Sequence, residues 1–175
     1  FSDNLTGAID QVYQNIKKDV HLQSMSGGTD LCGCLVAGDP TGPVNKGEIQ
    51  KAALGMKIEI LNEHGDRASK GEQGELVCAS AFPSMPVCFL NDPDDEKYRK
   101  AYFNKFEGKW HQGDFAEWTS SNGIIIHGRS DATLNPGGVR IGTAEIYAVV
   151  DTLKQINESA VVSQNWNGDN LSLIH

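Results

Sequence analysis

One run in the C-terminal third of the chain organises the rest of the sequence: Gly128-Arg129-Ser130-Asp131-Ala132-Thr133-Leu134-Asn135-Pro136-Gly137-Gly138-Val139-Arg140-Ile141-Gly142. Asn-Pro favours a sharp turn, and a Gly-Gly pair lets a ligand approach the main chain closely. Arg129 and Arg140 bracket these residues, and guanidinium groups bind oxygen-rich anions through forked donors. Two exposed surface arginines would be the simpler interpretation. Because Asp131 and a glycine pair lie between them, we instead favour a site where the chain bends and binds a phosphate group.

Alternating and helical patterns flank this run on both sides. Upstream, apolar residues at 115–119 and 124–127 surround Ser120-Ser121-Asn122-Gly123, which is a strong hairpin signal. Downstream, Thr143 is a candidate N-cap of a helix whose apolar face is formed by Ile146, Val149, Val150 and Leu153. A further strand is predicted over 159–163.

The N-terminal two thirds predict further short elements of both kinds. Apolar residues at helical spacing predict an amphipathic helix from Leu5 to Ile16. A strand at 19–25, a turn at 26–30 and an irregular loop at 32–47 are expected next. Alternation then predicts two antiparallel strands, at 56–60 and 74–78, and a short helix at 94–103 follows. The expected fold class is therefore mixed α+β.

Composition limits the partners of this chain. With 175 residues and a net charge of −8, no basic stripe is available to neutralise a nucleic-acid backbone. No apolar run approaches the roughly 20 residues that span a bilayer. Cys32, Cys34, Cys78 and Cys88 form no C-x-x-C pair, so reduced thiols and a cytosolic location are expected rather than zinc or disulfides. The first residue is Phe rather than Met, which is consistent with a fragment.

The turn Ser26-Gly27-Gly28-Thr29-Asp30 has the residue types of a phosphate site. Glycines permit close approach, the Thr29 hydroxyl can donate to a phosphate, and the Asp30 carboxylate can hold a hard cation. Because both Gly-Gly and Thr-Asp also favour turns, an ordinary surface turn is the simpler interpretation of this segment taken alone.

A second candidate is Trp110-His111-Gln112-Gly113-Asp114, at the entrance to a strand. The Asp114 carboxylate can accept hydrogen bonds from two neighbouring hydroxyls of a ribose, although an Asx-type strand start explains it equally well. His111 and His127 have no acid or nucleophile placed beside them by the sequence. We therefore expect solvated or packing histidines rather than catalytic bases.

Taken in order, these segments resemble the ATP-dependent acyl-CoA synthetases of the adenylate-forming superfamily. The resemblance covers nearly the whole chain and is strongest in Ser24–Asp30, Gly74–Cys78, Phe82–Val87, Gly113–Glu117 and Gly128–Tyr147. Several separate motifs in the order of the family are far more specific than any one of them alone.

The resemblance implies an activity with three substrates: a carboxylic acid, ATP and coenzyme A. The carboxylate attacks the α-phosphate of ATP to form an acyl-adenylate, and the CoA thiol then displaces AMP. No protein nucleophile is required, so catalysis depends on positioning and on stabilisation of phosphoryl oxygens, with Mg²⁺ sharing the charge. The small Gly27 implies an acid longer than acetate, such as acetoacetate, which would place the enzyme in ketone-body and lipid metabolism.

The resemblance also implies roles for individual residues. Gly27, Gly28 and Thr29 would bind ATP or AMP at the phosphates, and Asp30 would hold Mg²⁺. Asp114 and Arg129 would bind the ribose and phosphate side, and Arg140 would reach the phosphates during adenylation. Asp131 would be the hinge about which a small domain rotates, and Gly138 would line the path of the CoA pantetheine arm.

The chain also departs from the family pattern, which leaves alternatives open. An upstream Ser/Thr/Gly-rich phosphate loop and a C-terminal lysine are absent, and Gln112 replaces a small or hydroxyl residue. We expect residues 1–130 to be the distal part of a large AMP-binding domain and 131–175 the beginning of a mobile C-terminal domain. Alone, such a fragment would be inactive or nearly so. A truncated non-catalytic nucleotide-binding or interaction protein, a ligase for another short acid, and an adenylation module serving a carrier protein remain alternatives.

Overall fold

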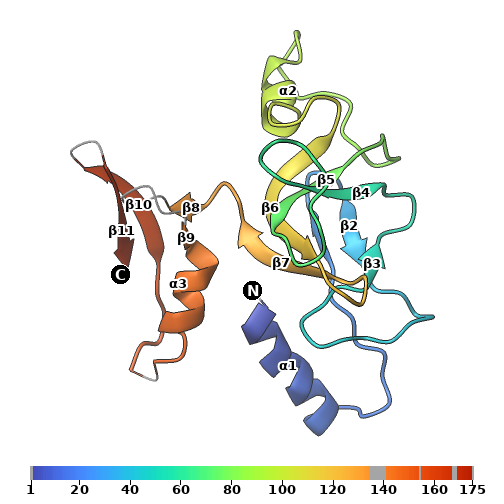
Figure 1. Ribbon diagram of the computed structural model, residues 1–175, viewed down its shortest axis with the longest axis vertical. Coiled ribbons are helices and arrows are strands. Elements are labelled where there is room, and N and C mark those ends of the chain that lie inside the picture. Colours follow the sequence, from blue (N-terminus) through green and yellow to red (C-terminus); the bar gives the residue numbers. More distant parts are fainter. Residues whose placement is uncertain (1, 135–140, 154, 167–168, 175) are drawn as a thin grey trace.

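The computed structural model describes residues 2–134, 141–153, 155–166 and 169–174, as a mixed α+β chain built from antiparallel sheets (Figure 1). The helices are α1 (Ser2–Asn15), α2 (Glu96–Tyr102) and α3 (Thr143–Val150). The strands are β1 (Ser26–Gly28), β2 (Gly33–Ala37), β3 (Lys51–Ala52), β4 (Ile58–Leu61), β5 (Gly74–Cys78), β6 (Trp110–Trp118), β7 (Ile124–Arg129), β8 (Thr133–Leu134), β9 (Ile141–Gly142), β10 (Val161–Trp166) and β11 (Asp169–Ile174). The predicted fold class is confirmed.

The largest sheet has the order β4-β5-β6-β7 and is antiparallel throughout. All five residues of β5 are buried, as expected for a strand with a neighbour on each side and packing on its faces. The turn between β6 and β7 is the predicted hairpin, with Asn122 at a φ of 65°. This geometry explains the Asn-Gly pair, because asparagine and glycine tolerate positive φ better than other residues.

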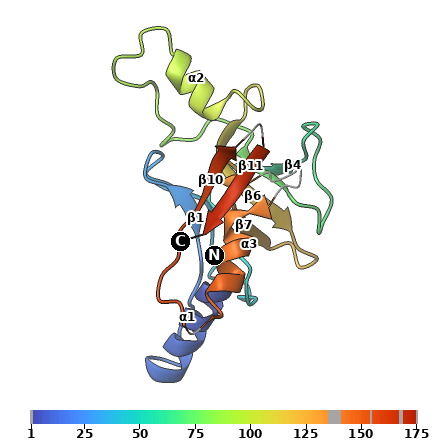
Figure 2. The same ribbon diagram turned by 90° about the vertical axis from the view of Figure 1, so that its left-hand side faces the viewer.

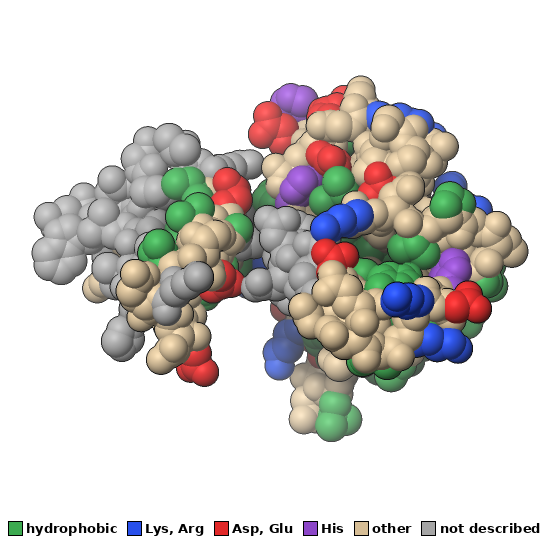
Figure 3. Space-filling model, turned by 90° about the horizontal axis from the view of Figure 1, so that it is seen from below, with side chains coloured by type: hydrophobic (Ala, Val, Ile, Leu, Met, Phe, Trp, Pro, Cys, Tyr) green, Lys and Arg blue, Asp and Glu red, His purple; other side chains and the backbone are tan. Residues whose placement is uncertain are grey.

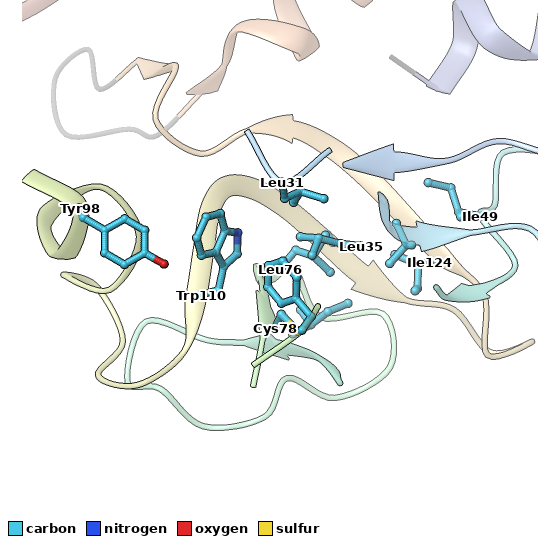
Figure 4. Close-up of a cluster of buried hydrophobic side chains, with 12 residues drawn as sticks. Leu31, Leu35, Ile49, Leu76, Cys78, Tyr98, Trp110 and Ile124 are labelled. Atoms are coloured by element: carbon cyan, nitrogen blue, oxygen red, sulfur yellow. The ribbon is translucent and has the colours of Figure 1, made fainter. Parts of the chain in front are cut away.

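A second sheet, β1-β2-β3, packs against the first around one hydrophobic core. Paired backbone hydrogen bonds of 2.8 Å between Ile49 and Ile124 join the segment before β3 to the start of β7. Leu31, Leu35 and Val36 are fully buried against residues of the larger sheet such as Leu76 and Trp110, as Figure 4 shows for most of this cluster. The packing brings the 26–30 turn near the far end of β7.

The described residues after Ser130 form a separate group beside the larger sheet (Figures 1 and 2). It contains the two-stranded pairs β8-β9 and β10-β11 together with α3, which contacts β7. Among the described residues, no helix is both long and apolar enough to span a bilayer. On the face shown in Figure 3, lysine and arginine side chains are interspersed with acidic ones, and no continuous basic stripe crosses its described part.

Several element predictions were wrong. Residues 19–25 contain no strand; the strand is β1, within the segment predicted as a turn, and the reversal follows at Thr29–Cys32. The loop predicted at 32–47 contains β2, whose Leu35 and Val36 are fully buried. The helix α3 is capped by Gly142 rather than Thr143, and the backbone N–H of Gly142 donates to Glu145 Oε1 at 3.0 Å. Tertiary pairing overrode the local signals at these positions.

Candidate functional site

The strand-and-turn segment from Gly27 to Asp30 is shaped by close strand packing. Gly27 pairs with Cys34 across β1 and β2, and a Cβ atom at Gly27 would lie 2.2 Å from the carbonyl oxygen of Gly33. No side chain fits there without a backbone shift, so glycine is required by the strand contact itself. At Gly28 a Cβ atom would lie 2.1 Å from the Asp30 carboxylate, which needs that space.

Two donors hold the Asp30 carboxylate. The backbone N–H of Leu31 donates to Oδ1 at 3.0 Å, and the Tyr102 hydroxyl donates to Oδ2 at 2.7 Å. Burial of the hydroxyl is the larger cause, and the hydrogen bond to the negatively charged Asp30 is the second; together they raise the pKa of Tyr102 to about 12. The tyrosine therefore remains a protonated donor at neutral pH. Tyr102 was not identified from the sequence, where it falls within the short helix predicted at 94–103.

Arg129 and Asp131 form a bidentate ion pair at the end of β7. Arg129 Nε donates to Asp131 Oδ1 at 2.9 Å, and Nη2 donates to Oδ2 at 2.6 Å. The pair raises the pKa of Arg129 and lowers the pKa of Asp131. It lies over Gly113, whose φ is +84° and where a Cβ atom would be 3.1 Å from Arg129 Nη2. Glycine at this position thus serves both the backbone conformation and the ion pair.

Asp114 lies opposite Arg129 in the β6–β7 register and is only 7% exposed. Burial raises the pKa of its carboxyl group, and the positive charge of Arg129, with Nη1 3.5 Å from Oδ1, partly opposes that shift. The negative charges of Glu75 and Asp131 also raise it. Asp114 is therefore a destabilised anion beneath an arginine, which is the type of group that a hydroxyl donor of a ligand can stabilise.

A buried glutamate supports the segment that follows β7. Glu75 on β5 is 1% exposed, forms an ion pair with Lys105, and accepts a hydrogen bond from the Ser130 hydroxyl at 2.7 Å. The backbone N–H of Ser130 also donates to the carbonyl of Gly113 at 2.8 Å. Two contacts therefore fix the residue immediately before Asp131. Neither Glu75 nor Lys105 was given a role from the sequence, although Glu75 lies within the Gly74–Cys78 segment that supports the resemblance.

An open cavity of about 850 Å³ brings most of the predicted residues together. Its lining includes Gly27, Gly28, Thr29, Asp30, Arg129 and Asp131. Gln112, which belongs to the second candidate segment, lines it as well, and so do Tyr102 and Lys105, which were not predicted to belong to the site. Asp114 is not among the lining residues and lies behind Arg129. Arg140 and Gly138 lie outside the described residues.

The charge of the cavity suits a phosphate ligand that brings its own metal. Lys100, Lys105 and Arg129 are the cations of its lining, and Thr29 offers a hydroxyl. Within the described ranges, no three His, Cys, Asp or Glu side chains gather in a geometry that could hold a metal ion. Asp30 presents a carboxylate at this cavity, and Mg²⁺ is commonly held by one or two carboxylates plus substrate phosphates. The donor set fits such a shared ion.

The two histidines of this region do not form a catalytic pair. His111 Nδ1 lies 3.1 Å from the backbone carbonyl oxygen of Tyr102, and His127 Nε2 lies 3.2 Å from Glu117 Oε2. The four cysteines are all free, as expected. Among the described residues, neither histidine is paired with a nucleophilic side chain.

Comparisons with known proteins show what this chain is similar to. The chain is 57% identical over 158 residues to the acetoacetyl-coenzyme A synthetase of Rhizobium meliloti, and 47% identical over 159 residues to that of Mus musculus. Each alignment covers 90% of this chain but 24% and 23% of the relative, so the chain spans about a quarter of the length of these curated relatives. No protein-family model matches the chain.

A solved structure supports the same relationship. The acetoacetyl-CoA synthetase from Streptomyces lividans superposes on 99% of this chain with a TM-score of 0.80 and 39% sequence identity, and the chain covers 26% of that structure. Agreement in both sequence and fold over nearly all of the chain indicates common ancestry rather than a shared architecture alone. The chain is therefore homologous to one segment of the acetoacetyl-CoA synthetases, which are adenylate-forming acyl-CoA synthetases.

Proposed function

We propose that this chain provides part of the nucleotide site and the hinge of an ATP-dependent acetoacetate–CoA ligase of the cytosol. The reaction converts acetoacetate, ATP and CoA into acetoacetyl-CoA, AMP and pyrophosphate. One observation carries the proposal: Thr29, Asp30, Arg129 and Asp131, from two sheets, line a single cavity in a chain homologous to enzymes of that name. The complete activity requires a longer polypeptide, because the relatives are about four times longer than the matching segment.

Two bond exchanges make up this reaction. A carboxylate oxygen of acetoacetate attacks the α-phosphorus of ATP, and the bond to the β-phosphate oxygen breaks to release pyrophosphate. The CoA sulfur then attacks the acyl carbonyl carbon, and AMP leaves. The residues of this segment would act by binding: Thr29 and Arg129 at phosphate oxygens, and Asp114 at the ribose hydroxyls. Arg140 would join the phosphate contacts during adenylation.

Mg²⁺ would be held by Asp30 together with phosphate oxygens of ATP, where it would offset the negative charge of the phosphates. The Leu31 N–H and the Tyr102 hydroxyl keep this carboxylate at the cavity. Each carboxylate oxygen has a second lone pair available for a cation, since these two bonds use only one on each.

The second part of the proposal concerns movement between the two half-reactions. Residues 1–130 would belong to the large domain and 131–175 to a mobile domain that pivots at Asp131. Rotation would remove Arg140 from the phosphates and bring Gly138 to the pantetheine arm of CoA. The contacts of Ser130 with Glu75 and Gly113 support this assignment, because they anchor the chain on the large-domain side of the pivot.

Acetoacetate is proposed on the basis of homology rather than of Gly27. The strand contact with Gly33 and Cys34 already accounts for glycine at this position, so its small size does not require a large acyl pocket. A pocket difference of one methylene is in any case worth only about 1–3 kcal/mol.

The deciding experiment is ATP–pyrophosphate exchange by the full-length enzyme that contains this segment. Acetoacetate, acetate and butyrate are compared as acids at equal concentration. We expect exchange to depend on Mg²⁺ and to be strongest with acetoacetate. Exchange with acetate alone would overturn the choice of acid. ATP binding without exchange for any of the acids would instead support a non-catalytic nucleotide-binding protein.

A further inference from the structure

The ring of Tyr102 is held in a fixed position by an aromatic cluster. It stacks on Trp110 with ring centroids 3.7 Å apart and an interplanar angle of 12°. Trp110 is 1% exposed and belongs to the hydrophobic core, where it lies near Leu31 (Figure 4). Phe89 and Tyr98 make edge contacts with the other sides of the Tyr102 ring, at 5.7 Å each. A ring held on several sides loses little further freedom when its hydroxyl forms a hydrogen bond.

The hydroxyl of this fixed ring connects two distant parts of the chain. It donates to Asp30 Oδ2 at 2.7 Å, across 72 residues of sequence, so α2 is linked to the turn after β1. The N–H of Leu31, a residue with no exposed surface, donates to the other oxygen. Two donors with buried anchors determine both the position and the rotation of the Asp30 carboxylate. An exposed aspartate without such partners would sample several rotamers.

We infer that Tyr102 is a positioning residue that orients the Asp30 carboxylate toward the metal-bearing phosphates of ATP. The inference rests on the proposed function and adds a residue to it. Tyr102 acts through Asp30, and its benefit is preorganisation: the carboxylate is already oriented before the ligand arrives. Gly28 contributes because it has no side chain, and the Asp30 carboxylate occupies the space where a Cβ atom would lie.

The test is Tyr102→Phe in the full-length enzyme, because phenylalanine keeps the stack on Trp110 and removes only the hydroxyl. Binding of ATP is measured by isothermal titration calorimetry with and without Mg²⁺, and binding of AMP without metal is measured in parallel. We expect the Kd of ATP with Mg²⁺ to rise about tenfold, the effect of losing a hydrogen bond to a charged group. The Kd of AMP should change less than twofold.

Tyr98→Phe is the matched control. Tyr98 lies on the same helix and in the same aromatic cluster, but its hydroxyl donates to the carbonyl of Pro86 rather than to a cavity residue. This variant should bind ATP with Mg²⁺ as tightly as the wild type. An equal loss in both variants would show that Tyr102 supports only the packing of α2, and would overturn the inference.

A double-mutant cycle with Asp30→Asn separates a positioning role from a direct one. If Tyr102 acts through Asp30, then Tyr102→Phe should weaken ATP binding in the wild type but have no further effect in Asp30→Asn. A full tenfold loss in both backgrounds would overturn the inference. A failure of the proposed function would give a different calorimetric result, because the wild type itself would then bind ATP with no dependence on Mg²⁺. Normal Mg²⁺ dependence in Tyr102→Phe would overturn the inference alone.

Discussion

Three carboxylates surround Arg129, and their environments give them different electrostatic properties. Asp131 is exposed and forms two short contacts with the guanidinium, so its pKa is lowered. Asp114 is buried with one long contact, so its pKa is raised. Glu75 lies deeper and adds to the negative potential at Asp114. The same arginine therefore neutralises one acid and only partly compensates another, because desolvation dominates at the buried position.

At the residue scale, Asp114→Asn should stabilise the fold and weaken the site. Because the folded state raises the pKa of Asp114, it binds this proton more tightly than the unfolded chain does. Stability is therefore lost as pH rises through the folded-state pKa. The isosteric amide removes that loss, so the variant should have a higher melting temperature than the wild type at pH 7. This difference should vanish below about pH 4, the range of an unfolded-state aspartate.

Binding of AMP by Asp114→Asn should weaken at the same time by about tenfold, since an amide is a poorer acceptor for ribose hydroxyls than a carboxylate. Thermal unfolding from about pH 3 to pH 8, which extends below the range of an unfolded-state aspartate, and AMP calorimetry on the same preparation measure both effects. A variant that is less stable at neutral pH but binds AMP normally would contradict both the electrostatic account and the ribose assignment.

At the scale of elements, β5 connects the core to the segment before the pivot. Its apolar residues Leu76 and Val77 are buried in the sheet, whereas Glu75 extends a charge toward Lys105 and Ser130. A register shift between Glu75 and Val77 opposite β6 accompanies this change of partners. Bulges of this type re-aim side chains next to sites. The strand thus combines packing with support for the end of β7.

The contact between Glu75 and Ser130 should be measurable as a coupling energy. Glu75→Gln and Ser130→Ala should each destabilise the folded protein, by about 1–3 and about 1 kcal/mol respectively. The double variant should lose less than the sum, with a coupling of about 0.5–1.5 kcal/mol, because Glu75→Gln weakens the hydrogen bond that Ser130→Ala removes. Urea unfolding of the four proteins provides the cycle.

Glu59→Gln is the matched control for this cycle. Glu59 is another buried strand glutamate, and its cationic partners are Arg67 at 2.6 Å and Lys109 at 2.8 Å. The loss of unfolding free energy in Glu59→Gln should simply add to the loss in Ser130→Ala. Equal coupling energies for Glu75 with Ser130 and for Glu59 with Ser130 would mean that the loss of any buried charge destabilises the sheet. The coupling would then not report the particular contact between Glu75 and Ser130.

At the scale of the whole molecule, the chain consists of a packed two-sheet body and a smaller group joined to it after β7 (Figure 1). The main core contains residues from Leu31 to Ile124, and none after Ile124 is among its described buried members. The joint at Ser130–Ala132 therefore connects parts that do not share one hydrophobic core. Such a joint is suited to a rotation in which the two parts move as rigid bodies.

Asp131→Pro should separate the two half-reactions of the full-length enzyme. Proline fixes φ near −65° and so restricts rotation at the proposed pivot. We expect ATP–pyrophosphate exchange within about threefold of the wild type, but thioester formation slowed by at least tenfold, as for a conformational step that limits turnover. Asp131→Ala is the control, because it also removes the ion pair with Arg129 while leaving the backbone free. Equal loss of both half-reactions in Asp131→Pro would exclude the hinge role.

Much of this architecture follows from local patterns, and the failures have a common physical cause. The hairpin at Ser120–Gly123, the strand Gly74–Cys78 and the first helix were predicted because their signals are local: turn chemistry, alternation and helical periodicity. The strand β2 was missed because glycines and nearby prolines made its segment resemble a loop. Its formation depends on partners in β1 and β3, and that information is not present in a short window.

The sequence alone indicated the family and the fold class, and it identified a part of the cavity lining, because several motifs can be recognised in their order along the chain without any knowledge of distances. Only the tertiary structure showed that Tyr102 reaches Asp30, that Asp114 lies behind Arg129, and that Glu75 holds the residue before the pivot. These contacts join residues separated by 72, 15 and 55 positions. The charge and hydrogen-bonding type of a side chain are set by its identity, but its partners are set by how the sheets and α2 pack.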